Sequence, residues 1–251
     1  MIPISGFGLQ HRAMGNHVST GIEELDHVLG GGFRLGSGIL ISGSSGTGKT
    51  TLANTIAKAA CDRGEKVLFM GFEESEEAMV ATMLIPGIDL APALERGLLK
   101  IITAMPEAFG TEKHLIRAFK AIDVFKPAHV IVDAISSFER MGSTRASFEF
   151  AMRLANRCKD EGITLIMTNQ SKGGSDDRVS ISGIGISSII DALVWLRFVE
   201  DGNRLKRTLL VIKSRGSKHS SQYHDFIITN HGIRLMKEVV DANPGTPDKD
   251  Q

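Results

Sequence analysis

The sequence is poor in the residues that mark several classes of protein. Its 251 residues include only two cysteines, Cys61 and Cys158, which are not spaced like metal ligands. We therefore expect free, buried thiols in a reducing cytosol rather than a disulfide framework. Lysine and arginine together number 29, as do aspartate and glutamate, so the net charge is zero. This balance creates no overall positive field that would favour nucleic acid.

Long apolar runs are also absent. No run approaches the ~20 residues that a helix needs to cross a membrane. The first residues, Met1–Gly8, lack the basic segment and apolar core of a signal peptide. The composition, 42% hydrophobic and 23% charged, is that of an ordinary globular protein. We expect a cytoplasmic protein without a membrane segment.

A glycine-rich loop is the most informative feature that is present. Gly43-Ser44-Ser45-Gly46-Thr47-Gly48-Lys49-Thr50 follows the apolar run Ile39–Ile41 and precedes a helical pattern. This is the G-x-x-x-x-G-K-[ST] phosphate loop in its strand-loop-helix context, which a chance glycine-rich turn would lack. Its backbone N–H groups can cradle phosphates at a helix N-terminus. The expected contacts to a nucleoside triphosphate and its Mg²⁺ come from Ser45, Gly46, Thr47, Gly48, Lys49, Thr50 and Thr51.

Apolar runs alternate with helical patterns after the loop, which predicts an α/β fold with a largely parallel central sheet. The runs are continuous rather than alternating, as in strands that are buried on both faces. The expected strands are 39–41, 67–70, 98–103, 130–132 and 164–167, and the expected helices are 76–84, 113–125 and 146–159.

The pattern changes after Asp191. Two apolar runs, 193–196 and 208–212, flank the turn signal Asp201-Gly202-Asn203, and a further strand is expected over 224–229. These runs predict an antiparallel hairpin at the carboxyl end of the sheet. We expect three segments: a leader or interdomain linker over 1–16, one ATPase-type domain over 17–240, and a disordered tail over 241–251.

Acidic residues follow two of the expected strands. Asp133 ends the strand 130–132 in the manner of a Walker-B carboxylate, which would hold a Mg²⁺-bound water; the alternative is a helix N-cap. Glu73 and Glu74 follow the strand 67–70, where a carboxylate can orient a nucleophile and accept its proton. We favour Glu73 for this role and for metal binding, and Glu74 or Ser75 as the cap of the next helix.

The order of these motifs resembles that of the KaiC-type ATPases of the RecA superfamily. The resemblance is carried by Val18–Ile22, Gly30–Phe33, the phosphate loop, Phe72–Ser75, Asp133, Asn169 and Lys213–Ser217. It covers roughly residues 17–235 and is greatest to the second, autokinase-type domain of the family's two-domain clock proteins. In that domain adjacent hydroxyl residues precede an aspartate, as Ser187 and Ser188 precede Asp191 here.

The resemblance implies a ring, usually of six subunits, that binds ATP and Mg²⁺ at each subunit interface. One subunit would supply the loop, Glu73 and Asp133, and its neighbour would supply Lys213 and Arg215 close to the γ-phosphate. Arg207 would lie near the base. Two charges at a strand end suit the arginine-finger role, although an exposed basic strand end is the simpler interpretation.

The implied autokinase activity is a hypothesis. Ser187 and Ser188 are candidate phosphorylation sites, or they begin a short helix ahead of Asp191. The sequence departs from the kinase domain by having Ser188 in place of threonine and Pro86-Gly87-Ile88 in place of an aromatic residue. The resemblance also allows a regulatory protein partner. The alternative function is a DNA recombinase or helicase-like motor, but the candidate DNA loop, 171–178, is charge-balanced and has no aromatic residue.

Overall fold

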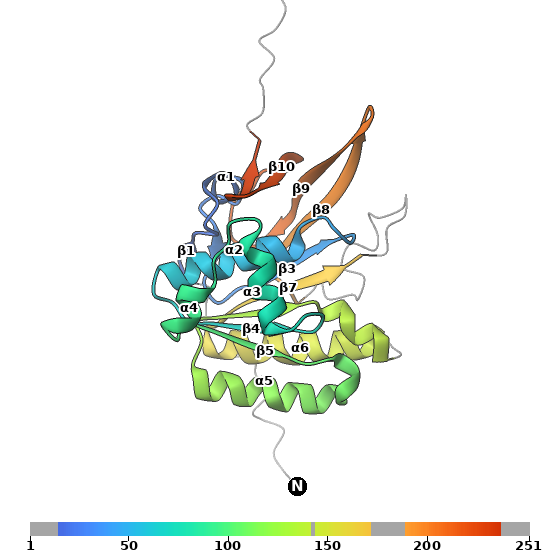
Figure 1. Cartoon of the computed structure of the whole chain (residues 1–251). Helices are drawn as coiled ribbons and strands as arrows, with labels where there is room; N and C mark the ends of the chain where they lie inside the picture. Colours follow the sequence, from blue (N-terminus) through green and yellow to red (C-terminus); the bar gives the residue numbers. More distant parts are fainter. Residues whose placement is uncertain (1–14, 142–143, 172–188, 237–251) are drawn as a thin grey trace, which may run out of the picture.

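The computed structural model describes residues 15–141, 144–171 and 189–236. The strands are β1 (His17–Val18), β2 (Phe33–Arg34), β3 (Gly38–Gly43), β4 (Val67–Gly71), β5 (Leu99–Thr103), β6 (His129–Asp133), β7 (Thr164–Gln170), β8 (Ala192–Asp201), β9 (Arg204–Ser214), β10 (His224–Thr229) and β11 (Gly232–Leu235). The α-helices are α1 (Glu23–Val28), α2 (Lys49–Asp62), α3 (Glu76–Leu84), α4 (Ala91–Glu95), α5 (Thr111–Phe125) and α6 (Thr144–Glu161). Two 3-10 helices, η1 (Pro106–Ala108) and η2 (Ile135–Met141), complete the set (Figure 1).

A nine-stranded sheet forms the centre of the molecule. Its order is β11-β10-β9-β8-β3-β7-β6-β4-β5, and the strands from β8 to β5 run parallel to one another. Strands β8, β9 and β10 each pair antiparallel with the strand that follows, and the β8–β9 hairpin projects from the rest of the molecule in Figure 1. The predicted α/β fold with a mostly parallel sheet and an antiparallel carboxyl-terminal hairpin is therefore confirmed.

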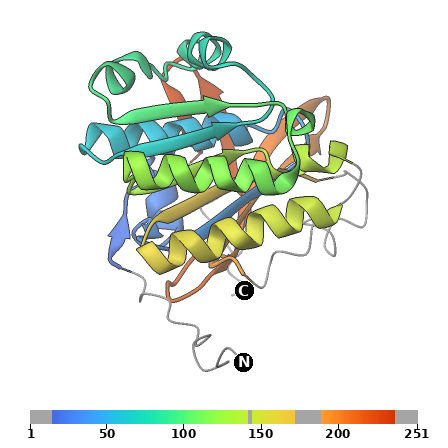
Figure 2. The same cartoon turned by 90° about the horizontal axis from the view of Figure 1, so that it is seen from below.

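The sheet separates two hydrophobic cores. Ile39 and Ile41 of β3 face one core with α2, whereas Leu40 between them faces the other. Helices α5 and α6 lie side by side over that second core, on the face of the sheet opposite α2 (Figure 2). Because side chains alternate along a strand, a strand that is covered on both faces must be apolar at every position. This explains the continuous apolar runs in the sequence.

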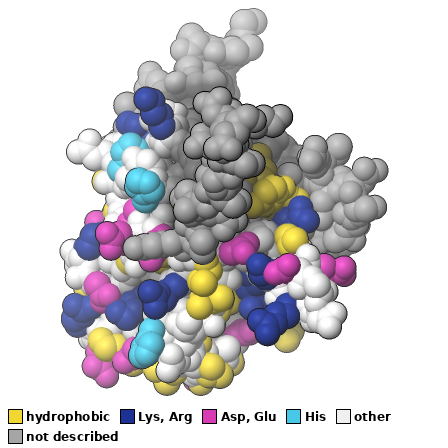
Figure 3. Space-filling model, turned by 90° about the horizontal axis from the view of Figure 1, so that it is seen from above, with side chains coloured by type: hydrophobic (Ala, Val, Ile, Leu, Met, Phe, Trp, Pro, Cys, Tyr) yellow, Lys and Arg dark blue, Asp and Glu magenta, His cyan; other side chains and the backbone are white. Residues whose placement is uncertain are grey.

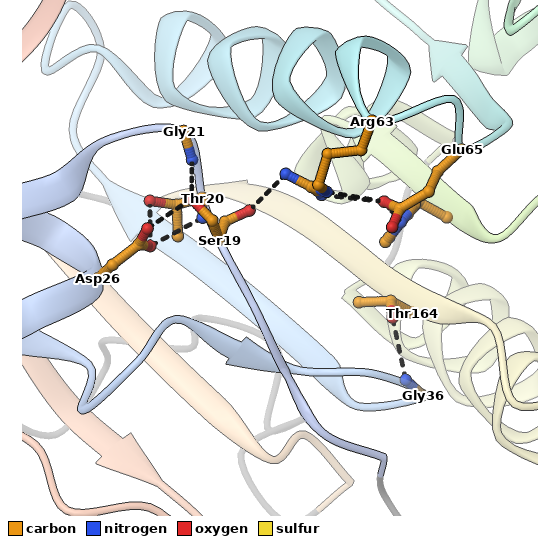
Figure 4. A network of polar contacts seen from close by, with 9 residues as sticks. Ser19, Thr20, Gly21, Asp26, Gly36, Arg63, Glu65 and Thr164 are labelled. Atoms are coloured by element: carbon orange, nitrogen blue, oxygen red, sulfur yellow. Dashed lines mark hydrogen bonds and ion pairs between the residues drawn. The ribbon is translucent and has the colours of Figure 1, made fainter.

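A polar network ties the amino-terminal segment to the amino ends of the strands (Figure 4). The Thr20 hydroxyl and backbone N–H each donate a 2.7 Å hydrogen bond to Oδ1 of Asp26. Arg63, at the end of α2, donates to the Ser19 carbonyl oxygen at 3.1 Å and to Oε2 of Glu65 at 2.9 Å. These bonds hold the carboxyl end of α2 in place, and α2 begins at the phosphate loop.

The described thiols behave as the sequence predicts. Cys61 and Cys158 are both free and buried, and burial raises the pKa of each, that of Cys61 to about 11. A thiol with a raised pKa is rarely in the reactive thiolate form. Among the described residues, no helix is long and apolar enough to cross a membrane. The predicted tail over 241–251, most of the leader, and Ser187 and Ser188 lie outside the described residues.

Candidate functional site

The phosphate loop connects the carboxyl end of β3 to the first residue of α2, as its mechanism requires. Gly46 and Gly48 have positive φ angles of 77° and 103°, a region that other residues rarely adopt. Gly43 lies too close to β8 for any side chain, because a Cβ there would lie 2.3 Å from the carbonyl oxygen of Leu196. Glycine is therefore required for two different reasons within one loop.

Lys49 lies inside the curl of the loop. Its Nζ donates a 2.7 Å hydrogen bond to the carbonyl oxygen of Ser44. Burial lowers the pKa of Lys49, and the nearby carboxylates of Asp133 and Glu73 offset this only in part. A half-buried cation beside inward-pointing N–H groups is suited to binding the oxygens of a phosphate chain.

Asp133 ends β6 and meets the hydroxyl groups of two neighbouring elements. Thr50 Oγ1 donates to Asp133 Oδ2 at 2.8 Å, and Thr168 Oγ1 of β7 donates a short hydrogen bond to Asp133 Oδ1. Burial raises the pKa of Asp133 in spite of these two hydrogen bonds. The carboxylate is therefore directed at the first turn of α2 and not at the N-terminus of a following helix.

The Thr50 and Asp133 pair fits a Mg²⁺ ion. Mg²⁺ prefers oxygen ligands and is usually held by one or two protein groups together with phosphate oxygens and water. A hydroxyl and a buried carboxylate, 2.8 Å apart beside a phosphate loop, are such a donor set. A nearby cation would also offset the cost of burying the Asp133 charge. The described residues contain no cluster of three or more His, Cys, Asp or Glu side chains that could hold a metal without a phosphate.

Glu73 is exposed at the carboxyl end of β4, where it borders a cleft of about 220 Å³ formed with the end of β5. The hydroxyl of Ser137 in η2 donates a 2.8 Å hydrogen bond to Glu73 Oε1. Glu74 is exposed in the same cleft, and Ser75 caps α3 by accepting the Ala78 N–H at 3.2 Å. Glu73 therefore lies beside open space, with one oxygen held by its own chain.

The β8–β9 hairpin and β10 cover the outer side of the phosphate loop. The Arg207 guanidinium lies 5.2 Å from the centre of the Phe198 ring and donates two 3.4 Å hydrogen bonds to the Gly46 carbonyl oxygen. Ile228 of β10 approaches Gly48 so closely that a Cβ there would lie 2.8 Å from its Cδ1 atom. Arg207 is thus next to the phosphate loop of its own chain, and its expected position near the base stays a prediction.

Lys213 and Arg215 lie at the opposite ends of the strands, beside the amino end of β8. The Arg215 N–H donates to the Asp191 carbonyl oxygen at 2.8 Å, and Asp191 binds the Gly38 N–H through Oδ2 at 2.9 Å. Lys213 donates to the Ile190 carbonyl oxygen at 2.7 Å. Gly38 begins β3 and the phosphate loop follows its end, so this pair lies about 16 Å along the strand from its own loop. Arg215 is half-exposed.

A cavity larger than the cleft beside Glu73 lies against α1. It has a volume of about 730 Å³ and is formed by α1, the segment 218–224 and the end of β11, with His27, His219 and His224 in its wall. Figure 3 shows the molecule from above the view of Figure 1, the side on which α1 and β10 lie, with histidine, acidic and basic side chains on the surface. The residues that form the cavity are separate from those of the phosphate loop.

Four further residues complete the site: the sequence indicates Thr168 only as part of the polar end of the strand 164–167, and it does not indicate Phe198, Ser136 or Ser137. Thr168 contacts Asp133, Phe198 lies under Arg207, Ser137 holds Glu73, and the Ser136 hydroxyl accepts the Gln170 N–H at 3.0 Å. The only signal for the two serines is that they follow the strand that ends in Asp133. A pair of serines after a strand is common in turns and does not by itself indicate a site.

Comparisons with known proteins agree with this geometry. The family described as "ATPase: KaiC" matches residues 18–240. The chain is 34% identical over 241 residues to the circadian clock protein KaiC2 of Synechocystis sp., covering 96% of this chain and 42% of that protein. It is 35% identical over 235 residues to the circadian clock oscillator protein KaiC of Parathermosynechococcus lividus, covering 94% and 43% respectively. The chain therefore spans less than half the length of these relatives. By this family match and this identity, it belongs to the KaiC family of ATP-binding ATPases.

Proposed function

We propose that the chain hydrolyses Mg²⁺-ATP at interfaces between copies of itself in a ring. The observation that carries this proposal is the separation of two half-sites on one sheet. The phosphate loop, Asp133 and Glu73 lie at the carboxyl ends of the parallel strands, whereas Lys213 and Arg215 lie beside their amino ends. A head-to-tail contact would bring the second half-site of one copy to the first half-site of the next, and such contacts close into rings when the rotation permits.

Within one copy, the phosphate loop holds the nucleotide. The loop N–H groups and Lys49 bind the phosphate oxygens, and Thr50 and Asp133 would hold Mg²⁺. Held by these two residues, Mg²⁺ would supply positive charge to offset the negative charge that develops during phosphoryl transfer. Glu73 borders the cleft between the ends of β4 and β5. From there it orients the attacking water and accepts a proton from that water. Arg207 fixes the loop from outside and lies near the base.

The neighbouring copy completes the site. Lys213 and Arg215 present two positive charges to the γ-phosphate, where charge accumulates in the transition state. The half-exposed Arg215 side chain is 3.8 Å from the carboxylate of Asp191, a contact weak enough to be exchanged for a phosphate. A hexamer is the ring size that the family suggests.

Self-phosphorylation is a further part of the proposal. Ser187 and Ser188 precede Asp191 in the sequence, and Asp191 borders the second half-site. In a ring, hydroxyl groups of this segment would approach the nucleotide of the next copy. The names of these relatives concern circadian clocks, so we propose a regulatory role in the cytoplasm, through a protein partner, for this chain.

Phosphate release by the full chain tests the proposal. Wild type should release phosphate from ATP only with Mg²⁺, and Lys49→Ala should reduce the rate at least a hundredfold. Lys58→Ala is the matched control, since Lys58 lies on the same helix but pairs with Asp62 on the surface. Equal rates for wild type and Lys49→Ala would refute the proposed function.

A further inference from the structure

The segment after β4, which carries Glu73, contacts the segment that begins at Asp133 in three ways. The Phe72 ring contacts the Phe138 ring with a centre-to-centre distance of 4.7 Å. Beside this ring contact, Ser137, the residue before Phe138, donates a 2.8 Å hydrogen bond to Glu73, the residue after Phe72. The Phe72 N–H also donates to the Asp133 carbonyl oxygen at 2.9 Å. Ring, backbone and hydroxyl contacts thus align the end of β4 with the start of η2.

Ser137 is itself fixed on both sides. Its N–H donates to the Ala134 carbonyl oxygen at 3.1 Å. The following Phe138 is fully buried and stacks on Phe150 of α6 with the ring centres 4.4 Å apart. Ser137 is only 3% exposed although its partner Glu73 is exposed. A buried hydroxyl on a rigid turn is therefore directed outward at a carboxylate that would otherwise be free to rotate.

We infer that Ser137 is a positioning residue for Glu73. A carboxylate has two oxygens, so a hydrogen bond to Oε1 leaves Oε2 to orient the nucleophile and accept its proton. Without the bond, an exposed glutamate samples several rotamers, and only some of them suit the reaction. This inference rests on the proposed role of Glu73 as the group that orients the nucleophile.

Loss of the hydrogen bond from Ser137 to Glu73 should affect the rate of hydrolysis, whereas loss of a purely structural hydrogen bond would affect stability. Ser137 lies at the end of the site where the nucleophile binds, whereas the nucleotide is held by the phosphate loop on β3. Removing the hydroxyl should therefore slow hydrolysis and leave ATP affinity unchanged. A structural role would instead lower stability and affinity together.

The experiment measures kcat for phosphate release and, separately, the Kd of ATP for the full chain. Ser137→Ala should lower kcat about tenfold, the effect of one hydrogen bond to a charged group, and change Kd less than about twofold. Ser137→Cys, of similar volume but with a weak donor, should also lower kcat. Ser147→Ala, which removes a fully buried serine hydroxyl from α6, should leave kcat unchanged.

A double-mutant cycle separates this inference from the proposed function. Glu73→Gln should be slow, and adding Ser137→Ala to it should cause no further loss, because the two residues act as one unit. Wild-type kcat in Ser137→Ala or Ser137→Cys, or a full additional loss in the double mutant, would overturn the positioning role while Glu73 kept its own. Wild-type kcat in Glu73→Gln would instead refute the role proposed for Glu73, and this inference with it.

Discussion

The Thr50 hydroxyl donates a 2.8 Å hydrogen bond to the Asp133 carboxylate, linking the first turn of α2 to the end of β6 across 83 residues of sequence. The bond joins the two groups that we expect to hold Mg²⁺. It also places them beside Lys49, at the N-terminus of a helix that attracts phosphate.

Removing the Thr50 hydroxyl should therefore impair the use of Mg²⁺. Thr50→Val keeps the shape of the side chain, and we expect phosphate release to fall at least tenfold, with a higher Mg²⁺ requirement. Thr55→Val is the matched control on the same helix, since the Thr55 hydroxyl donates only to the Thr51 carbonyl oxygen. A Thr50→Val variant with the Mg²⁺ dependence of wild type would show that this hydroxyl is not a ligand.

The close approach of Gly43 to β8 predicts a second effect. A Cβ at position 43 would lie 2.3 Å from the Leu196 backbone, so Gly43→Ala must push β8 away or move the loop. We expect a loss of about 2 kcal/mol or more in the free energy of unfolding. Gly110→Ala should change it by less than about 1 kcal/mol, because a Cβ there meets nothing within 4 Å. Urea denaturation of the two variants tests this, and similar losses would contradict it.

The buried His129 predicts how stability depends on pH. It is 2% exposed and lies 2.8 Å from Glu65, which in turn binds Arg63. Burial lowers the pKa of His129 below 6.5, although the Glu65 carboxylate acts against this shift. A histidine with a lowered folded-state pKa is more easily protonated in the unfolded chain, so its contribution is complete above pH 6.5 and declines as the pH falls.

Thermal unfolding between pH 7.5 and pH 5.5 checks this prediction. Wild type should lose more stability over this range than His129→Gln, which cannot take up the proton. The range stays above the titration of Glu65: burial raises the pKa of Glu65, but its hydrogen bonds to Arg63 and His129 outweigh this and hold the pKa below 4.5. The prediction fails if the two proteins respond identically to acidification.

Self-phosphorylation makes a prediction about mass. After incubation with Mg²⁺-ATP, the intact chain should gain the mass of a phosphate, and the Ser187→Ala/Ser188→Ala double variant should not. The double variant should still hydrolyse ATP, since neither serine belongs to the phosphate loop. An unmodified mass in wild type that has demonstrably hydrolysed ATP would mean that the chain is an ATPase without kinase activity.

The sequence predicted the parts of the fold that rest on local signals. Strands β3, β4, β6 and β7 are continuous apolar runs because both faces of the sheet are covered. The six-residue α1 and the four-residue β11 were not predicted, since neither is long enough to show a period. The loop residues, including Lys49, were found because their spacing is fixed by the phosphate chain that they bind.

The remaining site residues depend on contacts between distant segments. Ser137 holds Glu73 across 64 residues, and Thr168 reaches Asp133 across 35. Their positions follow from the strand order, in which β6 lies between β4 and β7, and a single sequence does not specify that order. The roles of Lys213 and Arg215 stay predictions, because they depend on contacts with a second copy of the chain.

The most direct test of the account is the activity of rings that contain two inactive variants. Lys49→Ala removes the phosphate-loop cation, and Arg215→Ala removes the arginine offered to a neighbour. Each alone should be at least tenfold slower than wild type, whereas Arg153→Ala, which removes an exposed arginine from α6, should not be slower.

Phosphate release should then be measured for equimolar Lys49→Ala and Arg215→Ala chains, mixed and shown to co-assemble by native mass spectrometry. Random mixing at head-to-tail interfaces pairs an intact loop with an intact arginine at about one interface in four, so activity should return to about a quarter of wild type. No recovery in demonstrably mixed rings, or a fully active monomer, would contradict a site that is shared between subunits.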